Sequence, residues 1–215
     1  LRDMRTDYNR VRMTRIFGTA HGAVEIIKGL KLKEVLSYDY SIQKDARYFN
    51  ALSGAGPKSG SDAQSSKGFI EYGKLISSTS LNYVRTFANK HHLDVLAAYE
   101  AESFQTDKAA GEKSKMPSDQ LFEPDNAAVI NSFVSSTQDY RLLSYLTRLN
   151  YDYDNRYYIA GSFRRDGSSR LAPEHRWGNF WSVSGSWRFT DEEFLKSITD
   201  VLNDGKIRLS YGVNG

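Results

Sequence analysis

Hydrophobic and polar residues alternate along much of this 215-residue chain. The clearest example runs from Asn179 to Phe189, where Trp181, Val183 and Trp187 fall on one face and three serines and Arg188 fall on the other. A period of two is the pattern of a β-strand whose two faces meet different surroundings. The chain is therefore predicted to consist mainly of β-strands.

The same alternation recurs often enough to predict about eight strands. In Leu93 to Glu102, for example, leucine, valine, alanine and tyrosine alternate with acidic residues. We expect the strands near residues 20–28, 30–45, 69–86, 91–106, 139–152, 156–166, 179–189 and 205–215.

Short and long connections alternate between these predicted strands. The short ones are Lys28-Gly29, residues 87–90 and residues 153–155, and the long ones are residues 46–68, 107–137 and 167–177. Loops above about 12–15 residues are uncommon in compact soluble domains. Outer-membrane barrels, in contrast, have short periplasmic turns and longer extracellular loops. The pattern predicts an all-β, antiparallel, up-and-down transmembrane β-barrel segment.

One connection departs from this rule. Residues 190–204 should form a short turn, yet Thr190 to Lys196 has the pattern of a capped helical turn. We therefore expect at most one or two short helices in the chain.

The alternation also predicts which side chains face lipid. A first set should point to a convex outer face, and a second set should point to the concave side. The first set is Trp181, Val183, Trp187, Leu143, Tyr145, Ile159 and Leu209; the second is Ser182, Ser184, Arg148, Arg164 and Arg208. Tyr151, Tyr153 and Tyr157 lie beside a predicted turn and should belong to an interfacial aromatic belt.

Composition fits a barrel and narrows the chemistry. Aromatic residues make up 13% of the chain, and the mean hydropathy of -0.57 agrees with strands that are polar on one face. The chain has no cysteine, which excludes disulfides and thiolate sites. Its net charge of +3 is scattered, without the basic patch of a nucleic-acid binder.

Candidate catalytic and metal-binding residues are few. His91 and His92 should point to opposite faces of one strand, so they predict no metal site. Asp94, Glu100 and Glu102 share a face, but a polar barrel lumen explains them better than catalysis. Residues 167–169 lack the spacing of a phosphate-binding loop. We expect neither an enzyme nor a cofactor.

A block of motifs covers about 65 residues from Tyr151 to Gly215. A strand ends in Phe163-Arg164-Arg165-Asp166-Gly167-Ser168-Ser169-Arg170, and Arg176-Trp177-Gly178, a strand ending in Trp187, Glu193-Phe194 and Ser210-Tyr211-Gly212 follow in that order. This block resembles the barrel of the SusC/RagA-type TonB-dependent transporters, which have the same motifs in the same order. Leu171 and Trp181 depart from residues that are frequent in that family.

The resemblance implies more than the residues themselves show. It implies a barrel of about 22 strands with a plugged lumen, an outer-membrane location, a SusD-like surface lipoprotein as partner, energy from TonB, and glycan or peptide cargo. Residues 1–215 would be part of one barrel domain, without the plug and the N-terminal region that contacts TonB. The motif residues should be structural; they are Arg164, Asp166, Gly167, Ser168, Ser169, Arg170, Arg176, Trp177, Gly178, Trp187, Tyr211 and Gly212.

The abrupt first and last residues predict an internal fragment, so its first and last strands should not pair with each other. No cargo-binding residue can be assigned from the sequence. Two alternatives stay open: a siderophore-type TonB-dependent receptor, and a soluble all-β carbohydrate-binding module. A β-rich hydrolase lacks a credible acid–base pair.

Overall fold

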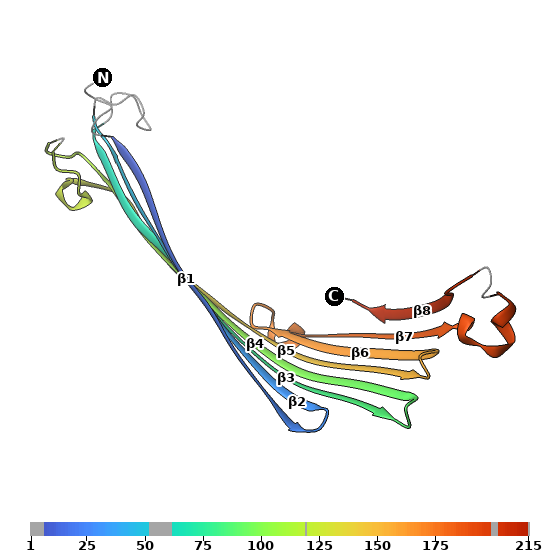
Figure 1. Cartoon of the computed structure of the whole chain (residues 1–215). Helices are drawn as coiled ribbons and strands as arrows, with labels where there is room; N and C mark the ends of the chain where they lie inside the picture. Colours follow the sequence, from blue (N-terminus) through green and yellow to red (C-terminus); the bar gives the residue numbers. More distant parts are fainter. Residues whose placement is uncertain (1–6, 52–61, 119, 199–201, 215) are drawn as a thin grey trace. The chain divides into compact units, whose positions relative to one another are not determined.

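The computed structural model describes residues 7–51, 62–118, 120–198 and 202–214. It shows one antiparallel sheet in which eight strands lie side by side in sequence order (Figure 1). The predicted fold class is therefore confirmed. The strands are β1 (Tyr8–Ile27), β2 (Leu30–Phe49), β3 (Gln64–Phe87), β4 (His91–Ser114), β5 (Val129–Tyr153), β6 (Tyr157–Ser168), β7 (Trp177–Arg188) and β8 (Lys206–Val213).

The first five strands are longer than the sequence pattern predicted. β1 begins at Tyr8 rather than near residue 20, and β4 continues to Ser114 rather than residue 106. The three predicted long loops are correspondingly shorter, at residues 50–63, 115–128 and 169–176. The prediction was wrong here because alternation is clear only where the two faces of a strand differ in polarity. In Tyr8–Gly18, arginines and apolar residues fall on both faces.

The described residues form no α-helix but contain four short 3₁₀ helices. These are η2 (Pro124–Asn126), η3 (Pro173–His175), η4 (Phe189–Asp191) and η5 (Glu193–Ile198). The absence of α-helices from the described residues agrees with the prediction of at most one or two short helices, and the expected helical turn after β7 is present as the 3₁₀ helices η4 and η5. None of the helices in the described part of the chain is long and apolar enough to cross a membrane.

Tight turns close the three hairpins. Ala88 and Asn89 both have positive φ, as do Asp154 and Asn155. In each turn the residue after this pair donates its N–H to the carbonyl of the residue before it, from Lys90 to Phe87 at 3.1 Å and from Arg156 to Tyr153 at 3.0 Å. This is the type I′ geometry that two-residue hairpin loops favour, and asparagine tolerates it well.

The chain divides into two compact units, and both contain parts of β1 to β5. Unit 1 comprises Leu1–Gly18, Tyr38–Leu75 and Phe104–Asp139; unit 2 comprises Thr19–Ser37, Ile76–Ser103 and Tyr140–Gly215.

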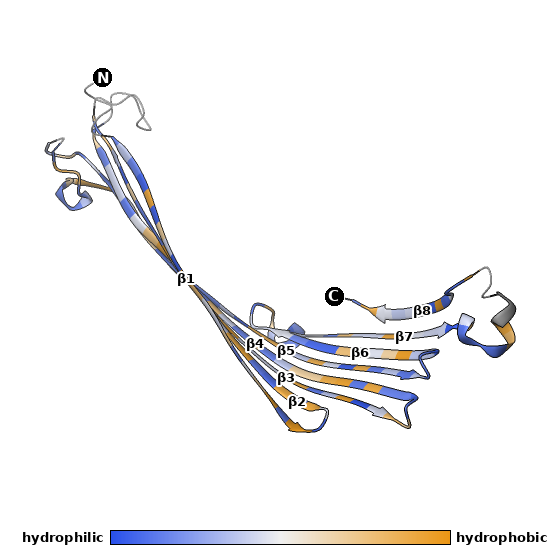
Figure 2. Ribbon diagram, viewed as in Figure 1, coloured by the Kyte–Doolittle hydropathy of each residue, from blue (hydrophilic) through white to orange (hydrophobic). Residues whose placement is uncertain are grey.

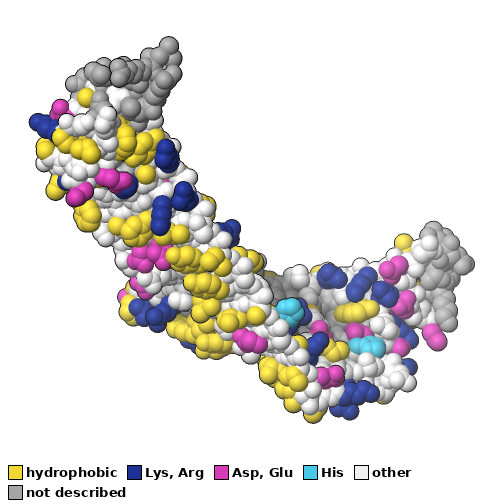
Figure 3. Space-filling view, turned by 60° about the vertical axis from the view of Figure 1, so that its left-hand side comes forward, with side chains coloured by type: hydrophobic (Ala, Val, Ile, Leu, Met, Phe, Trp, Pro, Cys, Tyr) yellow, Lys and Arg dark blue, Asp and Glu magenta, His cyan; other side chains and the backbone are white. Residues whose placement is uncertain are grey.

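Unit 2 places its apolar side chains at the surface. The pairing of β5, β6, β7 and β8 brings Leu149, Gly161, Val183 and Tyr211 into one row across the sheet. Val183 is 48% exposed and Leu209 77% exposed, and no hydrophobic residue among the described residues of this unit is buried. Figure 2 shows apolar and polar residues alternating along these strands, and Figure 3 shows hydrophobic side chains at the surface.

The predicted lipid-facing set thus shares one face of unit 2, and that face is not packed into a protein core. Register places Leu143, Tyr145, Ile159, Trp181, Val183, Trp187 and Leu209 together, and it places Arg148, Arg164, Ser182, Ser184 and Arg208 on the opposite face. This arrangement contradicts a soluble sandwich, whose apolar faces would pack against each other.

Unit 1 contains a small buried cluster. Tyr48 is fully buried, with its ring 6.0 Å from that of Tyr8 and 5.2 Å from that of Phe122. Phe122 belongs to the connection between β4 and β5. Its backbone carbonyl also accepts a hydrogen bond from Ser65 Oγ. The buried hydrophobic residues in the described part of the chain, Tyr48, Ala63 and Ala127, all belong to unit 1.

The sheet has two free edges. β1 and β8 stand at opposite ends of the strand order and are not paired with each other in the described residues. The prediction that the first and last strands stay unpaired is confirmed, and a self-contained small barrel is excluded.

Candidate functional site

The motif block of unit 2 forms the end of β6 and the start of β7. Gly167 lies directly opposite Trp177, and a Cβ added at Gly167 would be 2.8–2.9 Å from the indole ring. Only glycine leaves room for this ring. Trp177 is held from two other sides, because Tyr145 stacks on it at 6.2 Å and the guanidinium of Arg165 lies 4.8 Å from its ring centre.

The charged residues of the block bind one another or nearby backbone. Arg164 Nε donates to both carboxylate oxygens of Asp166 at 2.7 and 2.8 Å. Arg170 lies 4.1 Å over the ring of Tyr140, and Arg176 Nε donates to the carbonyl of Leu171 at 3.2 Å. Arg170 therefore holds the connection between β6 and β7 against β5, and Arg176 joins two residues within that connection.

The serines of the block connect this loop to β5 and β7. Ser168 N–H donates to the carbonyl of Arg176 at 3.0 Å, and Ser169 exchanges two bonds with Arg141, donating its own N–H and accepting at Oγ. Gly178 and Gly212 are sites of close approach, where an added Cβ would meet Phe180 at 2.7 Å and the carbonyl of Trp181 at 2.6 Å. Tyr211 packs edge-on against Trp181 at 5.8 Å. The structural role of the motif residues stays a prediction.

Two aromatic girdles lie on the apolar face of unit 2. Near the short turns, Tyr153 stacks with Tyr157 at 6.4 Å, and Trp187 lies directly across from Tyr157. Further along the strands, Tyr145 connects Trp177 with Tyr99.

The separation of the girdles matches a bilayer. Trp177 and Trp187 are ten residues apart in β7, a length of about 33 Å at ~3.3 Å per residue. A strand tilted by about 35–45° rises about 25 Å over that length, which is the height of the apolar band of outer-membrane barrels.

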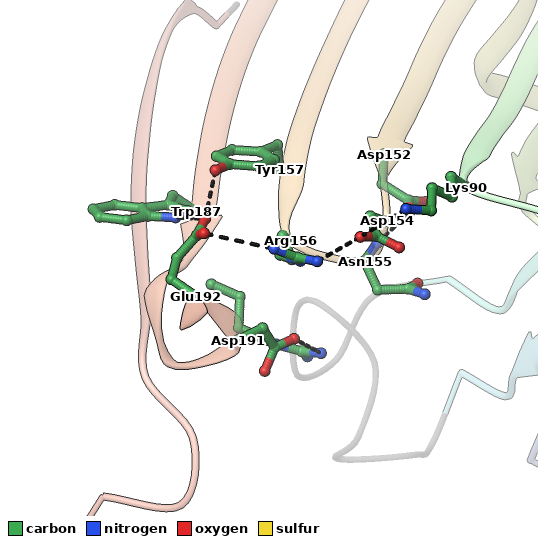
Figure 4. Close-up of polar contacts among 10 residues, drawn as sticks. Lys90, Asp152, Asp154, Asn155, Arg156, Tyr157, Trp187, Asp191 and Glu192 are labelled. Carbon is green, nitrogen blue, oxygen red and sulfur yellow. Dashed lines mark hydrogen bonds and ion pairs between the residues drawn. The ribbon is translucent and has the colours of Figure 1, made fainter. Parts of the chain in front are cut away.

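The turn end of unit 2 carries a network of hydrogen bonds and ion pairs around Glu192 (Figure 4). Glu192 is only 8% exposed, and its carboxylate accepts hydrogen bonds from the hydroxyl of Tyr157 and, at 3.1 Å, from Nε1 of Trp187. These two bonds hold the pKa of Glu192 below its ordinary value. Arg156 lies 3.5 Å from the same carboxylate.

The network continues from turn to turn. Arg156 Nη2 also donates to Asp154 at 2.6 Å, and Asp154 lies 3.9 Å from Nζ of Lys90. Backbone bonds follow the same path, from Asp154 N–H to the carbonyl of Lys90 at 2.7 Å and from Arg188 N–H to that of Arg156 at 2.8 Å. Sequence reasoning missed this network because its three segments, at Lys90, residues 154–157 and residues 187–192, are far apart in the chain. The acidic start of the helical turn was its only signal.

Known proteins agree with this geometry. The chain is 27% identical over 217 residues to TonB-dependent receptor P39 of Formosa agariphila, a match that covers 99% of the chain and 20% of the relative. It is 41% identical over 93 residues to TonB-dependent receptor SusC of Bacteroides thetaiotaomicron, covering 43% of the chain and 9% of that relative. No family model matches the chain.

Solved structures show the same fold. A structure of the RagAB peptide transporter superposes with a TM-score of 0.85 at 20% sequence identity, over 97% of this chain and 23% of that one. These matches support a barrel segment of the SusC/RagA type of TonB-dependent transporter. It spans about a fifth of the length of the P39 relative. These relatives are receptors and transporters and not enzymes.

The histidines of this segment lie as its strand pattern predicted. His91 bonds the hydroxyl of Tyr151 at 2.7 Å, whereas His92 bonds Thr86 at 2.9 Å on the other face of β4. The described residues hold no group of three or more histidine and carboxylate side chains arranged for a metal ion.

The carboxylates of Asp94 and Glu102, which share one face of β4, contact neighbouring strands. Asp94 accepts from Asn82 at 2.7 Å and lies 3.9 Å from Arg148, and Glu102 accepts from the hydroxyl of Tyr140 at 2.9 Å. They are cross-strand contacts on the polar face of the sheet.

Unit 1 has a hollow of about 250 Å³ on one face of its strands. Its lining includes the ion pair of Arg15 and Asp39 at 2.6 Å, and the rings of Tyr72 and Phe104, whose centres are 6.4 Å apart. Asp39 belongs to the set that alternation assigns to the polar face of β2. An aromatic pair beside a fixed ion pair is a chemistry that suits sugars and peptides.

Proposed function

We propose that residues 1–215 form part of one barrel domain of an outer-membrane importer that takes up glycans or peptides. A SusD-like surface lipoprotein would deliver the cargo, and TonB would supply the energy. The observation that carries the proposal is the exposed apolar face of unit 2 with its two girdles. Such a surface is stable only against lipid, because contiguous apolar patches of this kind are rare on soluble monomers.

The relatives support the finer parts of the proposal. One relative is named SusC, and the RagAB structures are described as peptide transporters and importers. A siderophore-type receptor has no comparable support among them. β1 to β5 each run through both units, which favours one continuous barrel wall over two domains.

The membrane-spanning part of the proposal is tested by cysteine accessibility in the complete transporter. Val183 and Ser182 are neighbours on opposite faces of β7, so we would replace each singly by cysteine in intact cells. A lipid-soluble maleimide should label position 183 and a water-soluble maleimide should not, while position 182 should reverse this preference. Equal labelling of both positions by the water-soluble reagent would contradict a lipid-facing surface.

Transport is tested by uptake of fluorescent oligosaccharides and oligopeptides into the same cells, with and without a protonophore. Energy-dependent uptake of one class is the expected result, and energy-independent uptake would contradict the role of TonB.

The hollow of unit 1 allows a matched test of cargo contact. Tyr72→Ala removes an exposed ring from the hollow, whereas Tyr38→Ala removes one from the opposite face. Loss of one stacking contact of about 1 kcal/mol should raise the KM for uptake roughly fivefold for Tyr72→Ala. Tyr38→Ala should leave it unchanged, and an equal effect of both variants would show that the polar face does not contact cargo.

A further inference from the structure

A second hollow in unit 1 is larger and differs in chemistry. It is a groove of about 490 Å³ whose lining includes four basic residues, Arg10, Arg12, Lys44 and Lys67, and one acidic residue, Asp45, which accepts a hydrogen bond from Gln43 at 3.2 Å. Between them lies a floor of small and aromatic residues, among them Ala46 and Phe69. Phe133 at its border is 73% exposed. The groove therefore combines positive charge with apolar surface.

The groove lies on the face of unit 1 opposite to the hollow of Arg15 and Asp39. Each strand contributes residues two apart to one face. β1 gives Arg10 and Arg12 to the groove but Met13 and Arg15 to the hollow, and β2 gives Lys44 and Ala46 to the groove but Asp39 and Ser41 to the hollow. The two surfaces are thus separated by the sheet.

The groove shares its face of β2 with two tyrosines, of which Tyr38 is exposed and Tyr40 is half-buried. Tyr38 and Tyr40 stack at 6.5 Å and have the same parity along β2 as Lys44 and Ala46. Four residues separate Tyr40 from Lys44, a distance of about 13 Å along a strand. Tyrosines concentrate at the headgroup level of membranes, so this pair places the start of the groove close to the headgroups in the proposed transporter.

Most of the positive charge in the groove is not neutralised. Lys67 forms an ion pair with Glu123. Arg10 lies 4.9 Å over the ring of Tyr8, and the described residues supply no ion pair to Arg10, Arg12 or Lys44. Three cations beside an apolar floor complement a ligand that has both anionic and apolar parts.

We propose that this groove binds the phosphorylated headgroup of a glycolipid in the outer leaflet, with acyl chain or sugar carbon against Phe69 and Phe133. Arginine and lysine are the side chains that recognise phosphate oxygens, and basic pockets on membrane proteins bind anionic headgroups in this way. The inference rests on the proposed placement of this face toward the membrane and not on the identity of the cargo.

The test uses the complete transporter, purified in detergent and stripped of lipid by exchange. Native mass spectrometry would count bound bisphosphorylated lipid A, with dephosphorylated lipid A of the same acyl chains as the comparison. The variant is Arg12→Gln with Lys44→Gln. Its matched control is Arg47→Gln with Lys108→Gln, which removes one arginine and one lysine from the opposite face of β2 and β4.

The proposal predicts that the wild type and the control bind the phosphorylated lipid. The groove variant should bind it at least about tenfold more weakly, since two charges near the lipid phosphates are lost. Dephosphorylated lipid A should bind poorly to all three proteins.

Three outcomes would overturn the proposal: equal binding of both lipids, equal loss in both variants, or displacement of the lipid by millimolar inorganic phosphate alone. The heat-dependent gel shift of folded barrels checks that each variant is folded. If the groove variant does not fold, Arg10→Gln alone replaces it with the same comparison. Uptake of cargo is measured in parallel, so a loss of lipid binding with uptake retained separates this proposal from the proposed function.

Discussion

Units 1 and 2 share five strands and both expose large apolar side chains, but they differ in which hydrophobic residues they bury. Unit 2 leaves its apolar residues at the surface, whereas unit 1 contains the buried hydrophobic residues of the described chain. Cross-strand contacts differ as well: in unit 1 an aromatic cluster is covered by a connection, and in unit 2 aromatic rings form exposed girdles. One strand can therefore pass from unit 2, where the apolar side chains are exposed, to unit 1, where some of them are buried.

Removing the ring of Tyr48 should have the largest effect on unit 1. Tyr48→Ala leaves a cavity between Tyr8 and Phe122, and loss of a large buried aromatic side chain costs about 3–5 kcal/mol. We expect the connection between β4 and β5 to be released, which limited proteolysis of the complete transporter in vesicles would detect. Tyr48→Phe keeps the ring contacts and should protect the connection. Equal protection of wild type and Tyr48→Ala would show that this cluster does not hold the connection.

A charge on the apolar face of unit 2 should have the next largest effect on the free energy of unfolding. The same charge on the polar face of unit 2 should have little effect. Val183 lies about midway between the girdle residues Trp177 and Trp187. Val183→Arg should lower the free energy of unfolding by about 2–4 kcal/mol, as arginine does at the midplane of a barrel. Ser182→Arg on the polar face is the control and should change it little. Urea unfolding in lipid vesicles measures the free energy of unfolding of both variants. Equal decreases would show that the two faces do not differ.

Filling the space beside Trp177 should lower the free energy of unfolding by a smaller amount than Val183→Arg does. Gly167→Ala forces a methyl group against the indole ring, whereas Gly161→Ala on the same face of β6 meets only a carbonyl at 3.7 Å. Overpacking of this kind costs about 1–3 kcal/mol, so Gly167→Ala should lower the urea midpoint and Gly161→Ala should not. A neutral Gly167→Ala would indicate that the ring can move away, and the structural role of the motif would then need revision.

The smallest effect concerns Glu192 and depends on pH. Its pKa is lowered in the folded state by the hydrogen bonds from Tyr157 and Trp187. Above its unfolded pKa of about 4.3, the ionised carboxylate therefore stabilises the network around Glu192 fully. This stabilisation is lost as the pH falls through the lower folded pKa. Fluorotryptophan NMR should show the Trp187 signal shifting only at acidic pH. In Glu192→Gln that titration should vanish, while in Glu193→Gln it should persist; persistence in both would assign it to another group.

Much of the fold follows from local sequence. The alternation in β7 and the turn residues Asp154-Asn155 predict a hairpin-rich sheet. The reason is that the side-chain period and the sign of φ depend on only a few neighbouring residues. The extensions of β1 and β4 were missed because both faces of these segments are mixed in polarity. The functional site was predicted only as a motif with a structural role.

The sequence by itself determined that this chain is a sheet with one apolar face, that its turns alternate in length, and which family it resembles. Only the tertiary structure decided that Glu192 connects to Tyr157, Trp187 and Arg156, and that Arg12 and Lys44 share a groove on the face opposite Arg15 and Asp39. The reason is physical: periodicity fixes the face to which a side chain points, but only strand register fixes which distant side chain lies beside it.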